Sequence, residues 1–181
     1  MQNKPHTDRA LTKNPTDLAT TAHSAAPYAP DLTSAAPPIT RAQIIAAART
    51  HLGAPFRHQG RSPAGMDCVG LLVLLARALG QPHEDVTGYT RRATGRGFLE
   101  HFHAHLVEIV PSQARPGDVL VFVETIYPCH TGILTSVAGS DTPHLIHAHA
   151  LRGCVLEEPF VGEWPAKLRF AFRFPSLVEP R

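Results

Sequence analysis

The stretch from Asp67 to Gly80 constrains the fold of this chain more than any other segment. Its apolar side chains cover most of the circumference of a helix, so the helix predicted there must be buried on nearly all sides. They are Val69, Leu71, Leu72, Val73, Leu74, Leu75 and Leu79. Such a helix needs other elements packed around it, and we expect it to lie at the centre of the core.

Two further helices are predicted around this one. Thr40 and Gln43 have the spacing of a capping box, so an earlier helix begins at Thr40 and stops at Gly53. The Pro and Gly residues between 54 and 65 are typical of a loop. A third, amphipathic helix is expected at 97–106.

After residue 118 the pattern changes from helices to strands. Short apolar or alternating runs, bounded by turn residues, predict several strands. We expect them at 119–123, 131–137, 144–150, 155–156 and 170–174. Helices followed by antiparallel strands are typical of an α+β fold, in which the N-terminal helices pack on an antiparallel β-sheet.

The chain has 181 residues, which suits one domain with a tail. Residues 1–37 are rich in Pro, Ala and Thr with few large apolar side chains, so we expect a disordered tail. The folded domain is predicted at 38–175 and a C-terminal tail at 176–181. A net charge of +2 does not indicate a nucleic-acid partner. The longest apolar run, 69–76, is too short for stable membrane insertion.

Cys68 is the first candidate for chemistry, because it lies at the N-terminus of the buried helix. The helix dipole contributes up to about 2 kcal/mol to an anion there, or roughly one pKa unit. Strong activation of the thiol therefore requires a nearby cation such as an imidazolium. The alternative is a cysteine that only packs in the core.

Histidines on two predicted strands are the candidates for that partner. His130 is predicted at the start of a strand, and the small Gly132 allows a neighbouring element to approach closely. His147 and His149 share one face of the next strand, where one of them could orient His130. An idle surface histidine is the alternative for His130, and a zinc site with Cys129 is the alternative for the group. Adjacent strand residues point to opposite faces, which disfavours zinc, and we expect no metal and no cofactor.

The order of these residues resembles that of NlpC-type cell-wall peptidases, a papain-like cysteine peptidase family. Five segments carry the resemblance: LGAPFRHQG (52–60), MDCVG (66–70), RPGDVLVF (115–122), HTGIL (130–134) and LIHA (145–148). The ending WPAKLRFAFRFP (164–175) is similar to a narrower branch found in phage-tail and prophage proteins.

The resemblance implies a papain-like fold and hydrolysis of amide bonds in peptidoglycan stem peptides. It implies that Cys68 is the nucleophile, His130 the general base and His147 the orienting residue. Asp67, Phe56 and His149 are the expected substrate-binding residues. Many relatives have Tyr where this chain has Phe56, and Ser where it has Val69, which bears on substrate recognition.

The resemblance further implies phage tail-tip proteins as partners and action at the bacterial cell wall. No signal peptide is apparent, so we expect synthesis in the bacterial cytoplasm and delivery within a phage tail or after release. Two other functions stay open. One is a catalytically silent tail-assembly or wall-binding module, and the other is an acyltransferase or deamidase on the same scaffold.

Overall fold

A computed structural model describes residues 36–90, 97–124 and 126–179. The helices are α1 (Arg41–Arg49), α2 (Cys68–Ala78), α3 (Phe98–His105) and α4 (Glu163–Lys167), with a 3-10 turn at Pro111–Gln113. The strands are β1 (Arg61–Ser62), β2 (Gly65–Met66), β3 (Val107–Ile109), β4 (Val119–Glu124), β5 (Tyr127–Thr135), β6 (His144–His149), β7 (Cys154–Pro159) and β8 (Leu168–Arg173).

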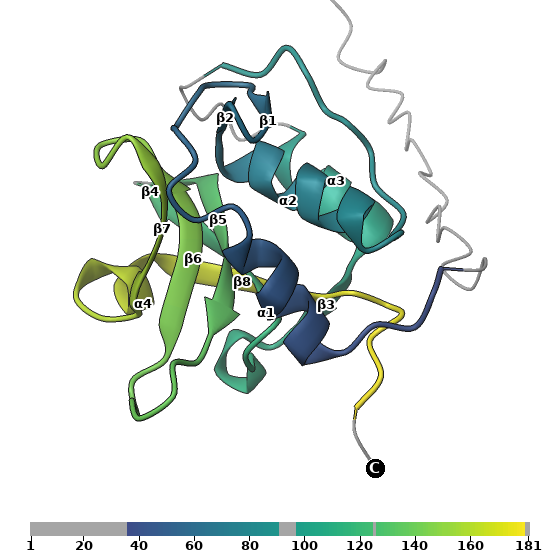
Figure 1. The fold of residues 1–181 in the computed structure, drawn as a ribbon, viewed down its shortest axis with the longest axis vertical. Coiled ribbons are helices and arrows are strands. Elements are labelled where there is room, and N and C mark those ends of the chain that lie inside the picture. The colour runs from purple at the N-terminus through teal and green to yellow at the C-terminus, as the bar shows by residue number, and fades with distance from the viewer. Residues whose placement is uncertain (1–35, 91–96, 125, 180–181) are drawn as a thin grey trace, which may run out of the picture.

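Six strands form one antiparallel sheet in the order β3-β8-β4-β5-β6-β7 (Figure 1). The larger core cluster joins the sheet to the helices and includes Leu71 and Leu75 of α2, both fully buried. A smaller cluster includes Leu120, Phe122 and, at its margin, Trp164 of α4. This arrangement confirms the predicted α+β fold with α2 inside it.

The starts of α1 and α2 follow from their capping residues. Thr40 and Gln43 form the predicted capping box before α1. Asp67 is the N-cap of α2, and its carboxylate accepts a hydrogen bond from the backbone N–H of Gly70. α1 ends at Arg49 rather than at the predicted Gly53, since residues 50–53 form turns.

The structure differs from the sequence prediction in several elements. The expected loop at 54–65 contains the start of the β1–β2 hairpin, and β3 and α4 were not predicted. The strand that carries His130 begins at Tyr127, so His130 lies inside β5 rather than at its start. β5 starts earlier than predicted because Tyr127, Pro128 and His130 pair with β4. The sequence around them has no alternation of apolar and polar side chains that would have predicted a strand.

Residues 176–179, in the predicted C-terminal tail, contact the folded domain. Ile39 donates a backbone hydrogen bond to Ser176 and accepts one from Val178. Glu179 forms an ion pair with Arg41 at 2.7 Å. These contacts hold the end of the chain against the domain. The tail predicted at 1–37 lies almost entirely outside the described residues.

No helix in the described parts of the chain combines the length and apolar character needed to cross a membrane.

Candidate active site

Cys68 is the first residue of α2 and lies against the sheet. Backbone amides of Val69 and of Thr131 on β5 lie close enough to its sulfur to favour the thiolate. The thiol therefore lies next to the strand segment that carries His130. Gly70 allows the preceding loop to lie close, since a Cβ there would come within 2.1 Å of the Gly60 carbonyl oxygen.

The electrostatic surroundings of Cys68 favour the protonated thiol. Burial raises its pKa to about 12, and the adjacent Asp67 carboxylate contributes in the same direction. The two backbone amides near the sulfur oppose these effects without cancelling them. The net effect is to disfavour the thiolate in the free protein.

His130 and His147 form a hydrogen-bonded pair across β5 and β6. Nε2 of His130 lies 2.8 Å from Nδ1 of His147. Gly132 makes the approach possible, as the sequence predicted. A Cβ at Gly132 would lie 2.8 Å from the carbonyl oxygen of Ile146 and 3.0 Å from Cβ of His147.

Burial also controls the protonation of this pair. It lowers the pKa of His130 to about 3, and the positive charges that His147, His149 and Lys167 can carry lower it further. Burial likewise lowers the pKa of His147 to about 4, although the adjacent Glu158 opposes the shift. Burial thus disfavours the imidazolium form of both rings, as it disfavours the thiolate of Cys68.

Cys68 and His130 line the same cavity of about 550 Å³. The register of β4 and β5 shifts between Phe122 and Val123. Phe122 pairs with His130 and Val123 with Pro128, so Cys129 has no paired residue on β4. Cys129 and His130 consequently both reach the cavity, although adjacent strand residues normally point to opposite faces. Within the described residues, no hydrogen bond joins the thiol to the His130 ring, a contact that often tightens only on substrate binding.

The other predicted site residues occupy three kinds of position. Phe56 and Asp67 line the cavity. His147 is fully buried behind it, which suits an orienting residue. His149 is absent from the lining, and its Nδ1 accepts from the backbone N–H groups of Leu151 and Arg152. The structure therefore does not bring His149 to the position expected of a substrate-binding residue.

Asp67 is held by protein donors from several segments. Its carboxylate accepts hydrogen bonds from the Tyr89 hydroxyl and the Gln59 backbone N–H, each at 2.6 Å, besides that from Gly70. Nη1 of Arg61 lies 3.4 Å from Oδ1 of Asp67. The carboxylate points to the N-terminus of α2, where it accepts the bond from Gly70. Tyr89 also lines the cavity and was missed, because only tertiary contact brings it to Asp67.

Glu158 and Trp164 complete the surroundings of the imidazole pair and were also missed. Oε1 of Glu158 lies 3.1 Å from Nε2 of His147 and accepts a hydrogen bond from Trp164 Nε1 at 2.9 Å. The Trp164 ring packs on His130, with the ring centroids 5.5 Å apart. The sequence signal was the WPAKLRFAFRFP motif, which begins at Trp164 and follows Glu158 in the chain.

A metal site is not formed by these residues. In the ranges that the structure describes, no group of three or more His, Cys, Asp and Glu side chains is arranged to hold an ion. This finding includes Cys129 and the histidines that suggested the zinc alternative.

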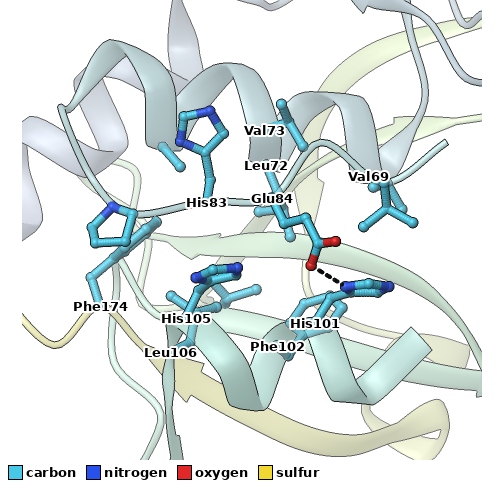
Figure 2. Close-up of a pocket in the computed structure, with 14 residues that line it drawn as sticks. Val69, Leu72, Val73, His83, Glu84, His101, Phe102, His105, Leu106 and Phe174 are labelled. Atoms are coloured by element: carbon cyan, nitrogen blue, oxygen red, sulfur yellow. Dashed lines mark hydrogen bonds and ion pairs between the residues drawn. The ribbon is translucent and has the colours of Figure 1, made fainter. Parts of the chain in front are cut away.

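A second cavity of about 80 Å³ lies between α2 and α3 (Figure 2). Its lining is mostly apolar, and the His101 ring at its margin pairs with Glu84 at 2.9 Å. His83 bonds through Nδ1 to the carbonyl of Gln81. These three polar groups bond to each other or to the backbone, and His105 also lines the cavity.

The fold and the position of Cys68 opposite the imidazole pair define the class of protein: the chain has a papain-like α+β fold. Residues 53–169 match the NlpC/P60 family, and the chain belongs to this family. No curated protein matches it.

Three solved structures illustrate the similarity. An NlpC/P60 family protein from Bacillus cereus ATCC 10987 has a TM-score of 0.58 and 18% identity, over 77% of this chain and 41% of that one. A lipoprotein-like NLP/P60 family protein from Staphylococcus aureus Mu50 has a TM-score of 0.55 and 20% identity, over 76% and 43%. The NlpC/p60 domain of the peptidoglycan hydrolase SagA has a TM-score of 0.50 and 26% identity, over 75% and 100%. The chain thus spans less than half of the first two proteins and all of the SagA domain.

Proposed function

We propose that this protein is a cysteine hydrolase that cuts amide bonds in peptidoglycan stem peptides. The observation that carries the proposal is the cavity shared by Cys68 and His130, with His147 hydrogen-bonded behind His130. Membership of the NlpC/P60 family and similarity to a domain of a peptidoglycan hydrolase support the substrate class.

The proposed reaction is acyl transfer through the sulfur. The Cys68 proton passes to Nδ1 of His130 as the sulfur bonds to the stem-peptide carbonyl carbon. The oxyanion that forms is stabilised by backbone N–H groups at the start of α2, with the N–H of Cys68 as one donor. Collapse of this intermediate breaks the C–N bond, and the leaving amine takes the proton from His130. Water, deprotonated by the same ring, then releases the acyl group from Cys68.

The pKa values of the free protein bear on the first step. Burial disfavours both the thiolate and the imidazolium in the free protein, so we expect proton transfer to accompany attack on the bound substrate. A bound carbonyl supplies the oxyanion that the backbone N–H groups at the start of α2 can stabilise as the proton moves. His130 therefore acts as a general base during attack.

The experiment is digestion of purified peptidoglycan with the full chain, followed by mass analysis of the released muropeptides. New stem-peptide termini that are absent with Cys68→Ala would support the proposal. Intact muropeptides after prolonged incubation with well-folded protein would favour a silent module. Acyl transfer to an added amine without hydrolysis would favour the acyltransferase.

The assignment to the phage-tail branch is a narrower proposal. It depends on residues 164–175 and on the resemblance described above, and the comparisons add no support for it. Association with phage tail-tip proteins and delivery to the cell wall remain predictions. Copurification of the chain with assembled tails is the direct test.

A further inference from the structure

We propose that Glu158 is a positioning residue that sets the tautomers of His147 and His130 and stabilises the imidazolium formed on attack. The inference rests on the proposed function of Cys68 and His130. It adds a third member, on a third strand, to the hydrogen-bonded series behind the thiol.

Strand register places Glu158 within reach of His147. On β7, Glu158 pairs with Leu145 of β6, and Leu156 pairs with His147. Glu158 is therefore the diagonal neighbour of His147 on one face of the sheet, a separation that a long side chain spans. Trp164 donates to the same carboxylate oxygen and so helps to hold the side chain in this orientation.

The carboxylate determines which nitrogen carries each proton. A carboxylate can only accept, so Nε2 of His147 must be the protonated nitrogen in the 3.1 Å contact. Nδ1 of neutral His147 is then an acceptor, and Nε2 of His130 must donate across the 2.8 Å contact. Nδ1 of His130 is left with a free lone pair, which is the form that can take the proton of Cys68.

Without an acceptor at position 158, the opposite tautomers become available. A proton on Nδ1 of His147 would be donated to Nε2 of His130, and the His130 proton would move to Nδ1. That form cannot accept a proton from the thiol. Glu158 excludes it by supplying the acceptor at the far end of the series.

The charge of Glu158 has a second effect. The other charged groups around the pair are His149 on β6 and Lys167 on α4, and both disfavour an imidazolium. Glu158 lies directly against His147 and favours positive charge there. It therefore partly offsets the burial of the imidazolium that forms when His130 accepts the thiol proton.

The test separates the acceptor role from the charge role with two variants. Glu158→Gln keeps a carbonyl acceptor and removes the charge, and we expect kcat to fall about threefold to tenfold. Glu158→Ala removes both, and we expect a fall of about tenfold to a hundredfold with KM within about twofold. Equal, near-wild-type kcat in both variants would overturn the proposal.

Nitrogen-15 NMR of the two imidazoles gives a readout that does not depend on activity. We expect protonated Nε2 in both rings of the wild type and of Glu158→Gln, and mixed tautomers in Glu158→Ala. Unchanged tautomers in Glu158→Ala would refute the positioning role. If all three proteins show the expected spectra but the wild type leaves peptidoglycan intact, the positioning role of Glu158 stands. The proposed hydrolase function then fails.

Glu157 provides the matched control. It is the adjacent acid on β7, and it bonds to Arg49 and Thr135 rather than to the imidazoles. Glu157→Gln makes the same change of charge, so Tm should fall while the tautomers of His130 and His147 stay as in the wild type. A tautomer change in Glu157→Gln equal to that in Glu158→Ala would show that the effect is a general loss of stability.

Discussion

Nε2 of His130 lies 2.8 Å from Nδ1 of His147, so one hydrogen bond joins neighbouring strands behind the candidate nucleophile. The orientation leaves Nδ1 of His130 as the nitrogen available to the thiol. It also distinguishes His147 from His149, whose ring centroid lies 5.1 Å from that of His147 and whose Nδ1 bonds to the following turn.

The first prediction concerns these two histidines. We expect His147→Ala to lower kcat by at least about tenfold, or roughly 1.4 kcal/mol of transition-state stabilisation. His147→Asn should retain more activity, because its carbonyl can accept from His130. His149→Ala should stay within a few-fold of the wild type. Measuring kcat of all three on one stem-peptide substrate decides the order, and a larger loss in His149→Ala would reverse the two roles.

Replacing Cys68 should abolish hydrolysis while the fold persists. Cys68→Ala removes one sulfur, which costs packing on the order of 1 kcal/mol. We expect no release of muropeptides and a nearly unchanged circular dichroism spectrum. The wild-type thiol should also react slowly with iodoacetamide at neutral pH, because its pKa is raised to about 12. Wild-type clearance of sacculi by a folded Cys68→Ala protein would remove Cys68 from the mechanism.

Gly132→Ala should damage activity through the spacing of two strands. The added Cβ would meet backbone of β6 at 2.8 Å, so β6 and His147 must move away from His130. We expect kcat to fall by about tenfold with less change in KM. Gly139→Ala is the control, because a Cβ there meets nothing within 4 Å while its positive φ still strains the backbone. Equal losses in both variants would point to stability rather than to the imidazole contact.

Acid should destabilise the protein through the buried imidazoles. The folded-state pKa values are about 3 for His130 and about 4 for His147. Imidazoles of the unfolded chain titrate near about pH 6.5, so below that pH the unfolded state binds more protons. Their contribution to stability is complete above about pH 6.5 and is lost as the pH falls toward about 4.

Thermal unfolding between about pH 7 and pH 4 measures this effect. We expect Tm to fall less steeply in a His130→Gln, His147→Gln double variant than in the wild type. His149, Glu158 and Lys167 also face the pair and stay in place in both proteins. His103→Gln, a change at an exposed histidine, is the control and should keep the wild-type slope. Parallel slopes in all three proteins would contradict the low pKa values.

Hydrolysis should persist in EDTA and be lost on alkylation of Cys68. The proposed reaction uses a sulfur nucleophile and an imidazole base and needs no ion. Cys129 also lines the cavity, so Cys129→Ser should be assayed beside the wild type to assign the alkylated thiol. Loss of activity in EDTA that added zinc restores would favour the metal alternative.

Local sequence patterns determined much of this protein. The apolar run after Asp67 specified a buried helix, and the cap at Asp67 placed Cys68 at its first turn. The α+β class followed from the change of periodicity after residue 118. Gly132 marked the close approach of a second strand. These features depend on residues within a turn or two of one another, so they can be read along the chain.

Tertiary structure decided which of those residues meet and in what charge state. Glu158 reaches His147 through the register of β6 and β7, and Tyr89 reaches Asp67 across 22 residues. Burial disfavours the thiolate of Cys68 and the imidazolium of His130, whereas the helix dipole considered alone favours a thiolate. Strand register and desolvation arise from contacts between distant segments. No local spacing encodes them, and they exist only once the sheet and α2 have packed together.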